Sequence, residues 1–283
     1  HENQFDYPQA NQQHSLVEAQ VTSIYSALAA DRIVFNSHYN HDSFMAGCNA
    51  LLEKLPDYVP SGVVPRLRNK ASVRPVPLDE GCFADVPPEW PGVANKAGKR
   101  ALRVLWVGRF EHDKGADGLL RILRKLDARG LGYELAVTGQ EFRQSPREFG
   151  EIQTVFAHRL VHFGFLESRT RYQAMLQAAD IVLSTANHEF QGLAVLEAVA
   201  RGCLPIVPAR LVYPEMYPAS CCYQSQPDDP EQEAESAVSL IMDAARRLLV
   251  DAARPDVSNY RQSRMAERYA QVFDNVMATQ DSL

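Results

Sequence analysis

The strongest constraint on the fold lies between residues 102 and 208, where short, continuous apolar runs are separated by segments of helical periodicity. Strands that are apolar on both faces are typical of parallel sheets covered by helices. The pattern therefore predicts an α/β domain with a doubly wound sheet, which binds ligands at the carboxyl ends of its strands. Strands are expected near residues 102–107, 133–138, 160–163, 181–185 and 204–207, and helices near 116–129, 146–157, 168–178, 231–250 and 265–277.

The stretch from residue 187 to residue 198 carries the clearest chemical signal. It follows an apolar run, and Gly192 stands where an amphipathic helix begins. The first turn of a helix has free N–H groups and a partial positive charge, which suit a phosphate, and a glycine lets a ligand come close. Glu189 and Glu197 bracket this anion site, and carboxylates accept hydrogen bonds from paired sugar hydroxyls. A solvent-facing position is the better interpretation of either glutamate alone, but the Glu-x7-Glu spacing after a buried strand favours a sugar-nucleotide site.

A second motif, residues 107–115, follows the first strand of this domain and contains Gly108, Arg109 and Lys114. It is neither a dinucleotide fingerprint nor a P-loop. Arg109 and Lys114 would place two positive charges on one short loop, enough to neutralise a leaving diphosphate without a metal ion. Taken alone, the motif fits a solvated turn with an ordinary surface ion pair equally well. Together with the helix start described above, it favours a diphosphate site.

Composition bounds the class of protein. The chain has 283 residues, 46% of them hydrophobic and 23% charged, which is typical of a globular protein large enough for two domains. The formal charge of −6 argues against binding nucleic acid by net charge alone, although a local basic patch stays open. The five cysteines form no C-x-x-C pair, which favours a reducing cytoplasm over a disulfide framework or zinc site. Since no run of about 18 apolar residues occurs, no membrane span is expected.

Four segments are expected along the chain. Residues 1–77 form the C-terminal part of an N-terminal domain, and residues 78–100, rich in proline and glycine, form a linker. Residues 101–258 form the nucleotide-sugar domain, and residues 259–283 form a C-terminal helix. Because the first residue is histidine and the opening strands of a parallel sheet are missing, the natural chain is expected to begin upstream.

Within the first segment, the pattern predicts a helix over residues 16–30, a strand over 32–37, a helix over 41–55 and a short strand over 73–77. The stretch 59–71 reads as a loop. A compact basic run crosses the end of this loop, made of Arg66, Arg68, Lys70 and Arg74. These cations are candidates for contacting RNA phosphates, and a solvated loop is the simpler alternative.

Two further features stay open at this stage. His1, His14, His38 and His41 invite a metal site, but no acidic or cysteine partners complete a ligand set, so surface or cleft histidines are favoured. The aromatic stretch 163–166 would line a base pocket or belong to the core.

The two donor motifs resemble those of GT-B retaining glycosyltransferases of the family-4 type. The resemblance rests on Gly108-Arg109, Lys114-Gly115, Glu189-x7-Glu197 and Gly192-Leu193. Residues 265–269 are similar to the segment that returns to the first domain in that fold. The resemblance implies an α/β GT-B architecture, with two Rossmann-like domains facing a cleft and the N-terminal domain incomplete in this chain.

The N-terminal residues narrow the resemblance. The opening His-Glu-Asn-Gln-Phe-Asp-Tyr-Pro, with residues 34–37 and 40–44, is similar to the tRNA-queuosine α-mannosyltransferase family. This resemblance implies transfer of mannose from GDP-mannose, with retention, to queuosine at the anticodon of tRNA-Asp. It implies GDP-mannose and tRNA as substrates, no cofactor or metal, a cytoplasmic location and no membrane attachment. It says nothing about the oligomeric state.

The resemblance also implies residue roles. Arg109 and Lys114 would hold the diphosphate, Glu197 would accept the ribose hydroxyls, and Glu189 would contact the sugar. His1 matches the position where related enzymes place a histidine against the donor sugar. In the same donor motifs, Gly108 lies beside the phosphates, and Gly192 and Leu193 offer backbone N–H groups.

The implied chemistry is a front-face displacement, in which the departing diphosphate oxygen takes the proton of the acceptor hydroxyl. Stabilising charge on the leaving group would then be the main catalytic effect. Two alternatives stay open. One is a related glycosyltransferase with another sugar nucleotide and a saccharide or lipid acceptor, and the other is a nucleotide-sugar-binding or RNA-binding module without turnover.

Overall fold

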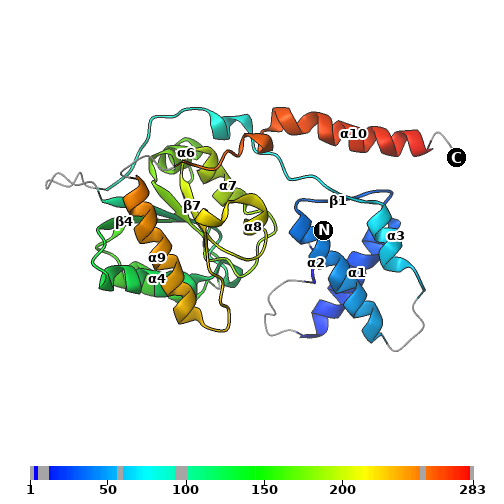
Figure 1. The fold of residues 1–283 in the computed structure, drawn as a ribbon, viewed down its shortest axis with the longest axis horizontal. Helices are drawn as coiled ribbons and strands as arrows, with labels where there is room; N and C mark the ends of the chain where they lie inside the picture. Colours follow the sequence, from blue (N-terminus) through cyan, green and yellow to red (C-terminus); the bar gives the residue numbers. More distant parts are fainter. Residues whose placement is uncertain are drawn as a thin grey trace. The chain divides into compact units, whose positions relative to one another are not determined.

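The computed structural model describes residues 3–5, 13–55, 60–92, 101–143, 145–248 and 253–280. The chain divides into two compact units (Figure 1). Unit 1 comprises residues 1–77 and 259–283, and unit 2 comprises residues 78–258. Each unit is described by itself below.

Unit 2 is built on a six-stranded parallel sheet, in the order β5-β4-β3-β6-β7-β8. The strands are β3 (Leu102–Val107), β4 (Tyr133–Thr138), β5 (Leu160–Gly164), β6 (Ile181–Leu183), β7 (Leu204–Pro208) and β8 (Cys222–Tyr223). The prediction of a doubly wound α/β sheet is confirmed. The strand order reverses between β3 and β6, and such a switch point opens a crevice at the carboxyl ends of the two strands. One donor motif, residues 107–115, follows β3, and the other, residues 187–198, follows β6.

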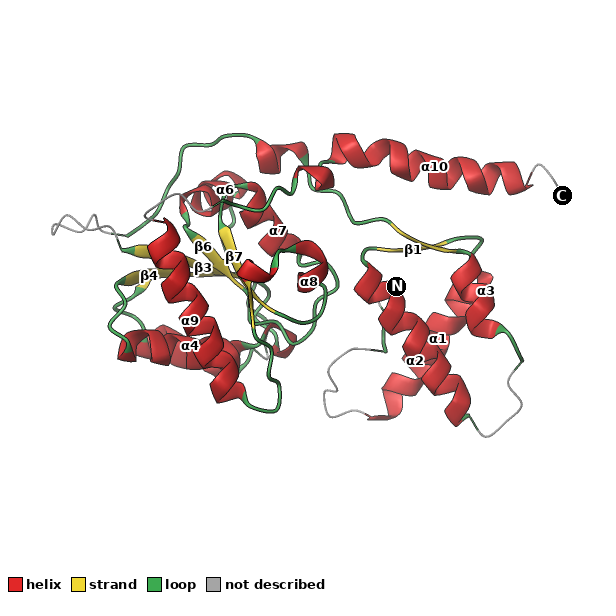
Figure 2. Cartoon of the chain, in the orientation of Figure 1, coloured by secondary structure: helices red, strands yellow, loops and turns green. Residues whose placement is uncertain are grey.

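The helices of unit 2 cover the sheet, as Figure 2 shows. They are α4 (Ala116–Ala128), α5 (Arg147–Val155), α6 (Arg169–Ala178), α7 (Leu193–Ala200), α8 (Tyr213–Met216) and α9 (Pro230–Leu248). Helix α4 contacts α5 and α9, whereas α6 contacts α7. The apolar periodicity of α4 explains its position, because Leu119, Ile122, Leu123 and Leu126 are all buried on one stripe.

Residues 78–92 belong to unit 2, although the sequence predicts a linker over residues 78–100. Leu78 and Cys82 are buried, and a short 3-10 helix, η1 (Glu80–Phe83), begins after Asp79. The indole of Trp90 donates to Glu134 at 2.7 Å. Proline-rich composition was a poor guide here because it does not reveal which side chains pack against a neighbouring sheet. Residues 93–100 lie outside the described part of the chain.

Unit 1 contains a two-stranded parallel sheet in which Ile33 pairs with Ala71 and Phe35 with Val73. Its elements are α1 (Gln13–Ala29), β1 (Ile33–Phe35), α2 (His38–Lys54), α3 (Val63–Asn69), β2 (Ala71–Val73) and α10 (Gln262–Gln280). The core of this unit is made by Phe44, Met45 and Cys48 of α2, together with Phe35 and Leu67. The hydroxyl of Tyr269 on α10 donates to the carbonyls of Arg74 and Pro75, at 3.0 and 3.1 Å.

The expected loop over residues 59–71 is wrong, because α3 occupies most of it. Pro65 is compatible with this helix because it lies in the first turn, where a backbone N–H has no intrahelical acceptor. Gly62 precedes the helix with φ +79, and its carbonyl accepts the N–H of Arg66 at 3.0 Å. Val63 and Leu67, four residues apart, bury one face of the helix.

No helix within the described residues is both long enough and apolar enough to cross a membrane. All five cysteines are unpaired thiols.

Candidate functional site

The two donor motifs meet through one lysine. Nζ of Lys114, in the turn after β3, lies 3.1 Å from Oε2 of Glu189, in the loop after β6. The same ammonium lies 3.0 Å from Oδ2 of Asp113 and donates to the carbonyl of His188 at 3.2 Å. The Lys114 side chain is only 15% exposed, so these contacts replace most of its water. The switch point of the sheet therefore holds a compact cluster of one cation and two carboxylates.

Backbone groups complete the surroundings of the Glu189 carboxylate. Oε1 of Glu189 accepts the N–H groups of Phe190 and Gln191, at 3.1 and 3.4 Å. Burial alone would raise the pKa of Glu189, but Lys114 and the backbone N–H groups, including that of Gly192, outweigh burial and lower it. Burial likewise opposes the charge of Lys114, yet Glu189 and Asp113 raise the pKa of Lys114. Both groups are therefore charged at neutral pH.

Two glycines serve the turn and the loop in different ways. Gly115 has φ +69, and a Cβ at this position would lie 1.9 Å from the carbonyl oxygen of Thr185. No other residue fits there without moving the backbone. Gly192 precedes α7 with φ +67, and a Cβ there would lie 3.3 Å from Cε1 of Tyr213 and 3.5 Å from Cγ of Glu189. Gly115 therefore permits the close contact between the turn and the loop, whereas Gly192 supplies the left-handed backbone at the start of α7.

Beside this cluster lies a pocket of about 440 Å³. Its lining comes from the carboxyl ends of β3, β4 and β5, from α6 and α7, and from Cys82 in the 78–92 segment. Gly108, Arg109 and Glu197 line it, and a Cβ on Gly108 would lie 3.6 Å from Cγ of Lys114. The volume suits part of a small ligand. The pocket and the Lys114 cluster are therefore neighbours that share the turn after β3.

The carboxylate of Glu197 lines the pocket and is hydrogen-bonded to a neutral side chain, that of Tyr172. The hydroxyl of Tyr172 donates to Oε2 of Glu197 at 3.0 Å, and Sγ of Cys82 lies 4.0 Å from Oε1. Burial raises the pKa of Glu197, and the Tyr172 hydrogen bond and the charges of Arg169 and Arg201 offset only part of this effect. Burial also holds the pKa of Tyr172 well above its usual value, so the phenol remains a donor. Glu197 is placed to accept further hydroxyl groups from within the pocket.

Arg109 lines the same pocket as Glu197. Its side chain is 49% exposed, and its guanidinium pairs with Glu111 at 3.0 Å. An exposed pair of this kind contributes little to stability, so the guanidinium can exchange its partner at small cost. Leu193, the first residue of α7, is 39% exposed. The structure thus brings Lys114, Glu189 and Gly192 together, and it places Arg109 and Glu197 in the adjoining pocket.

The aromatic stretch 163–166 divides between two roles. Phe165 and Leu166 line the pocket, and the Phe165 side chain is 64% exposed. Phe163 packs instead against Phe110, with ring centroids 5.2 Å apart. The strand β5 ends at Gly164, which has φ +103, so Phe163 belongs to the strand whereas Phe165 and Leu166 belong to the loop after it.

In unit 1, the residues that suggested a particular subfamily contact one another. The amide of Asn3 donates to Oδ1 of Asn40 at 3.1 Å and to Oγ of Ser43 at 2.9 Å. The rings of Phe5 and Phe44 lie edge to face, with centroids 5.5 Å apart. The opening segment and α2 therefore form one polar and aromatic contact. His1 lies outside the described residues.

The four basic candidates of unit 1 separate into two kinds. Arg66 and Arg68 are exposed on α3. Lys70 instead donates to the carbonyls of Leu28 and Ala30, at 2.7 and 2.5 Å, where it neutralises the C-terminal end of α1. Arg74 is half-buried and donates to its own neighbour, the carbonyl of Val73. Only the two arginines of α3 form an exposed basic pair within this run.

Of the four histidines that suggested a metal site, the structure describes the side chains of His38 and His41. His41 contacts Asp42 at 2.7 Å, and the side chain of His14 lies outside the described part. Within the described residues no three His, Cys, Asp or Glu side chains are arranged to hold a metal ion.

Comparison with known proteins assigns the chain to a family. The family model of the group 1 glycosyl transferases matches residues 92–243, which is more than half of the chain. The chain belongs to the group 1 glycosyl transferases. A second model, for the N-terminal region of tRNA-queuosine alpha-mannosyltransferase, matches residues 1–78.

Curated relatives of this group 1 glycosyl transferase include the tRNA-queuosine alpha-mannosyltransferase of Drosophila melanogaster. It is 35% identical over 226 residues, which cover 80% of this chain and 60% of the relative. A glycogen synthase of Mycobacterium tuberculosis is 29% identical over 126 residues, which cover 43% of this chain and 29% of the relative. The chain therefore spans less than two thirds of the length of these relatives.

Solved structures agree on the fold. Sucrose-phosphate synthase from Thermosynechococcus elongatus matches with a TM-score of 0.60 at 17% identity, covering 96% of this chain and 64% of that chain. HepE of Anabaena, solved in complex with UDP and glucose, matches with a TM-score of 0.61 at 14% identity, covering 99% and 70%. The predicted GT-B fold of the α/β class is confirmed.

Sequence reasoning missed several polar residues around the pocket of this group 1 glycosyl transferase. Arg201 is 6% exposed, lines the pocket and donates to the carbonyls of Ala84 and Gly81. Its spacing of four residues from Glu197 places both on one helix face, which was an available signal. No local pattern could identify Tyr172 or Cys82, because both reach Glu197 through tertiary packing.

Proposed function

We propose that this protein transfers mannose from GDP-mannose, with retention, to queuosine in tRNA, at the anticodon of tRNA-Asp. The observation that carries the proposal is the match of residues 1–78 to the N-terminal model of tRNA-queuosine alpha-mannosyltransferase. The 35% identity to the Drosophila melanogaster enzyme of that name supports it. The contact of Asn3 with Asn40 and Ser43 supports it further, because these residues belong to the motif behind the resemblance.

In this proposal the nucleoside diphosphate spans the pocket and the Lys114 cluster. Phe165 and Leu166 lie against the base, and Glu197 accepts the ribose hydroxyls. Arg109 exchanges Glu111 for a phosphate, and Lys114 turns toward the second phosphate. The N–H groups of Gly192 and Leu193 lie at the start of α7, where the helix dipole favours negative charge.

The reaction then proceeds by front-face displacement. The bond from the anomeric carbon to the diphosphate oxygen breaks, and the bond to the queuosine hydroxyl forms on the same face. The departing diphosphate oxygen takes the proton of that hydroxyl. Lys114 and Arg109 stabilise the charge that develops on the diphosphate, and Glu189 contacts the mannose. The contact of His1 with the donor sugar stays a prediction, and no metal ion or other cofactor is required.

For the acceptor, Arg66 and Arg68 are proposed to meet phosphates of the anticodon stem, because they are the exposed members of the basic run. The location that fits this substrate is the cytoplasm.

A second candidate is a related glycosyltransferase that uses a UDP-sugar. It is favoured by one observation, that the structurally similar HepE protein was solved with UDP and glucose. The two candidates differ in the base that the pocket must accept. The relative affinity for GDP and UDP separates them before any acceptor is known.

The test uses the complete natural protein that carries this sequence. It is incubated with GDP-mannose and queuosine-containing tRNA, and the nucleosides are analysed by mass spectrometry for a hexose added to queuosine. UDP-glucose and tRNA without queuosine serve as controls, and calorimetry compares GDP with UDP. Transfer only from a UDP-sugar, or tighter binding of UDP than of GDP, would reject the proposed donor.

A further inference from the structure

The loop between β6 and α7, residues 184–192, carries Glu189 and leads to Gly192. Its first half is held on the β3 side of the sheet. The N–H groups of Asn187 and His188 both donate to the carbonyl of Asp113, at 2.8 and 3.1 Å. The hydroxyl of Thr185 donates to the carbonyl of Lys114 at 3.0 Å. These bonds fix the loop against the turn that supplies the cation.

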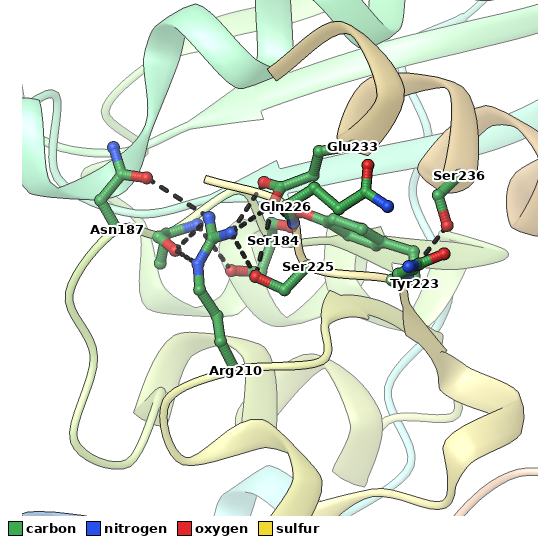
Figure 3. A network of polar contacts seen from close by, with 10 residues as sticks. Ser184, Asn187, Arg210, Tyr223, Ser225, Gln226, Glu233 and Ser236 are labelled. Atoms are coloured by element: carbon green, nitrogen blue, oxygen red, sulfur yellow. Dashed lines mark hydrogen bonds and ion pairs between the residues drawn. The ribbon is translucent and has the colours of Figure 1, made fainter. Parts of the chain in front are cut away.

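On its other side the loop is held by Arg210, which follows β7 (Figure 3). Nε and Nη2 of Arg210 both donate to the carbonyl of Ala186, at 3.2 and 3.1 Å. Nη2 also lies 3.3 Å from Oδ1 of Asn187. A planar guanidinium that donates twice to one carbonyl fixes the direction of that carbonyl as well as its position.

Arg210 is itself anchored by the opposite edge of its guanidinium. Nη1 lies 2.7 and 2.6 Å from the two carboxylate oxygens of Glu233 on α9, and 2.9 Å from Oγ of Ser225. The carboxylate of Glu233 also accepts the backbone N–H of Gln226 at 2.6 Å. The side chains of Arg210 and Glu233 are each 16% exposed. A pair so shielded from water is rigid, and it ties the loop to a long helix.

The backbone next to Arg210 has an unusual conformation, which is consistent with a fixed position of the Arg210 side chain. Leu211 is the non-glycine residue with a positive φ among the described residues, at +59. Such a conformation is costly for a leucine and persists only where surrounding contacts enforce it. The turn after β7 therefore accepts strain at the residue beside Arg210, where the guanidinium is directed toward Ala186.

We propose that Arg210 is a positioning residue for the donor site, which acts by clamping the β6–α7 loop between the β3 turn and Glu233 of α9. The effect of Arg210 on catalysis rests on the proposed function, in which Glu189 and Lys114 touch the donor. Its effect on the loop does not depend on that proposal. With the clamp intact, the loop presents the Glu189 carboxylate to Lys114 at one distance and direction. When the clamp is loosened, the loop is held on the β3 side only, and its bonds to Asp113 are expected to open more often.

The variant Arg210→Lys tests the clamp. Lysine retains the charge opposite Glu233, but its single ammonium cannot reach Ala186, Asn187 and Glu233 in the fork geometry of arginine. Amide hydrogen exchange of Asn187 and His188 is expected to become about tenfold faster or more, because their donor bonds to Asp113 open more often. Exchange of amides in β3 and β4 is expected to stay unchanged.

Kinetics provide the second measurement. Displacing a group that contacts the reacting sugar lowers turnover, by about tenfold to a hundredfold in kcat for this variant. The KM for the donor is expected to change by about threefold or less, since the pocket around Glu197 and Phe165 is not attached to the clamp. A general loss of folded protein would instead lower the active fraction and leave the kcat of the folded molecules unchanged.

Arg121→Lys is the matched control. Arg121 also reaches α9, where it pairs with Glu231 at 3.2 Å, and it pairs with Asp117 of its own helix at 2.9 Å. Neither partner belongs to the β6–α7 loop. This variant is expected to match the unsubstituted protein in loop exchange and in kcat.

Three outcomes decide the proposal. Faster loop exchange together with a lower kcat supports it. Unchanged exchange at Asn187 and His188 in Arg210→Lys overturns the clamp, and faster exchange with unchanged kcat overturns its role in positioning. A lack of mannosyl transfer by the unsubstituted protein would reject the proposed donor or acceptor and leave the clamp standing, because hydrogen exchange is measured without any substrate.

Discussion

Glu189 and Glu197 lie eight residues apart on either side of the start of α7, and they are surrounded in opposite ways. Glu189 is paired with a lysine and accepts backbone N–H groups, and these contacts outweigh burial and lower its pKa. Glu197 is paired with a phenol, and burial raises its pKa. Both carboxylates are largely removed from water, so burial alone does not explain the difference.

The comparison shows that the partner decides what burial does to a carboxylate. At Glu189, a cation 3.1 Å away and the backbone N–H groups outweigh the effect of burial on the pKa. At Glu197, the Tyr172 hydrogen bond and the charges of Arg169 and Arg201 offset only part of that effect. We therefore expect Glu189 to contribute to stability at neutral pH, and Glu197 to reduce it while keeping its capacity to accept hydroxyl groups. In the proposed donor site, Glu189 contacts the sugar and Glu197 the ribose.

The largest expected effect is that of Lys114→Ala, which removes the cation from the Glu189 side of the comparison. Two buried carboxylates, Glu189 and Asp113, would lose their partner, and the free energy of unfolding is expected to fall by about 3 kcal/mol. Turnover is expected to fall by about 10³-fold, because in the proposed reaction Lys114 is a main cation of the diphosphate leaving group. Urea unfolding and initial rates measure the two effects. Lys125→Ala is the control, since Lys125 pairs with Glu231 on the surface at 2.9 Å. Equal losses in both variants would show that the cluster has no special role.

The next effect concerns Glu197→Gln. In the proposed site Glu197 accepts the ribose hydroxyls, so removing its charge is expected to weaken GDP binding by about a hundredfold, measured by calorimetry. Stability should respond in the opposite sense. The pKa of Glu197 is raised in the folded state, so its carboxyl favours folding below the ordinary value of 4.5 and opposes it as pH rises through the folded pKa.

The Glu197→Gln variant is therefore expected to be more stable than the unsubstituted protein at pH 7, and to lose that advantage near pH 4. Tyr172→Phe provides a graded comparison, because it removes one hydrogen bond and leaves the carboxylate; GDP affinity is expected to fall by about fivefold. A lower stability of the glutamine variant at pH 7 would contradict the assignment of Glu197 as a carboxylate whose burial is only partly compensated.

The smallest expected effect is the pH dependence of Glu189→Gln. The pKa of Glu189 is lowered in the folded state, so its contribution to stability is present above the ordinary value of 4.5 and is lost as pH falls through the folded pKa. At pH 7 the variant is expected to be less stable by about 2 kcal/mol, and the two proteins should converge at low pH. Thermal unfolding between pH 3 and pH 8 measures this, with Glu151→Gln as the surface control. A difference that does not change with pH would show that Lys114 and Glu189 do not form a charge pair.

Much of the fold was predictable because strand and helix periodicity are local properties. The runs 102–107 and 133–138 lie in β3 and β4 as expected, and α4 differs from its predicted range by one residue at its end. The prediction of a loop over residues 59–71 was wrong, because α3 has only seven residues and its apolar face is marked by little more than Val63 and Leu67. The segment 78–92 failed for a tertiary reason, since its packing against unit 2 depends on residues far along the chain, such as Glu134 and Ala174.

The candidate site divides in the same way. Arg109, Lys114, Glu189 and Glu197 could be singled out because each stands in a short motif beside a strand end. Their grouping could not be foreseen, because it depends on which strands are neighbours at the switch point. Arg210 and Tyr172 had no local signal at all, since the first acts across 24 residues on Ala186 and the second across 25 residues on Glu197.

By itself, then, the sequence determined the alternation of strands and helices and the glycines that permit tight turns, because periodicity and backbone freedom are properties of neighbouring residues. Only the tertiary structure decided that Glu189 faces a lysine and Glu197 a phenol. It also decided that an arginine after β7 donates hydrogen bonds to the loop that carries Glu189. The physical reason is that ion pairs, hydrogen bonds and desolvation depend on distances in space, and those distances are set by strand order and helix packing.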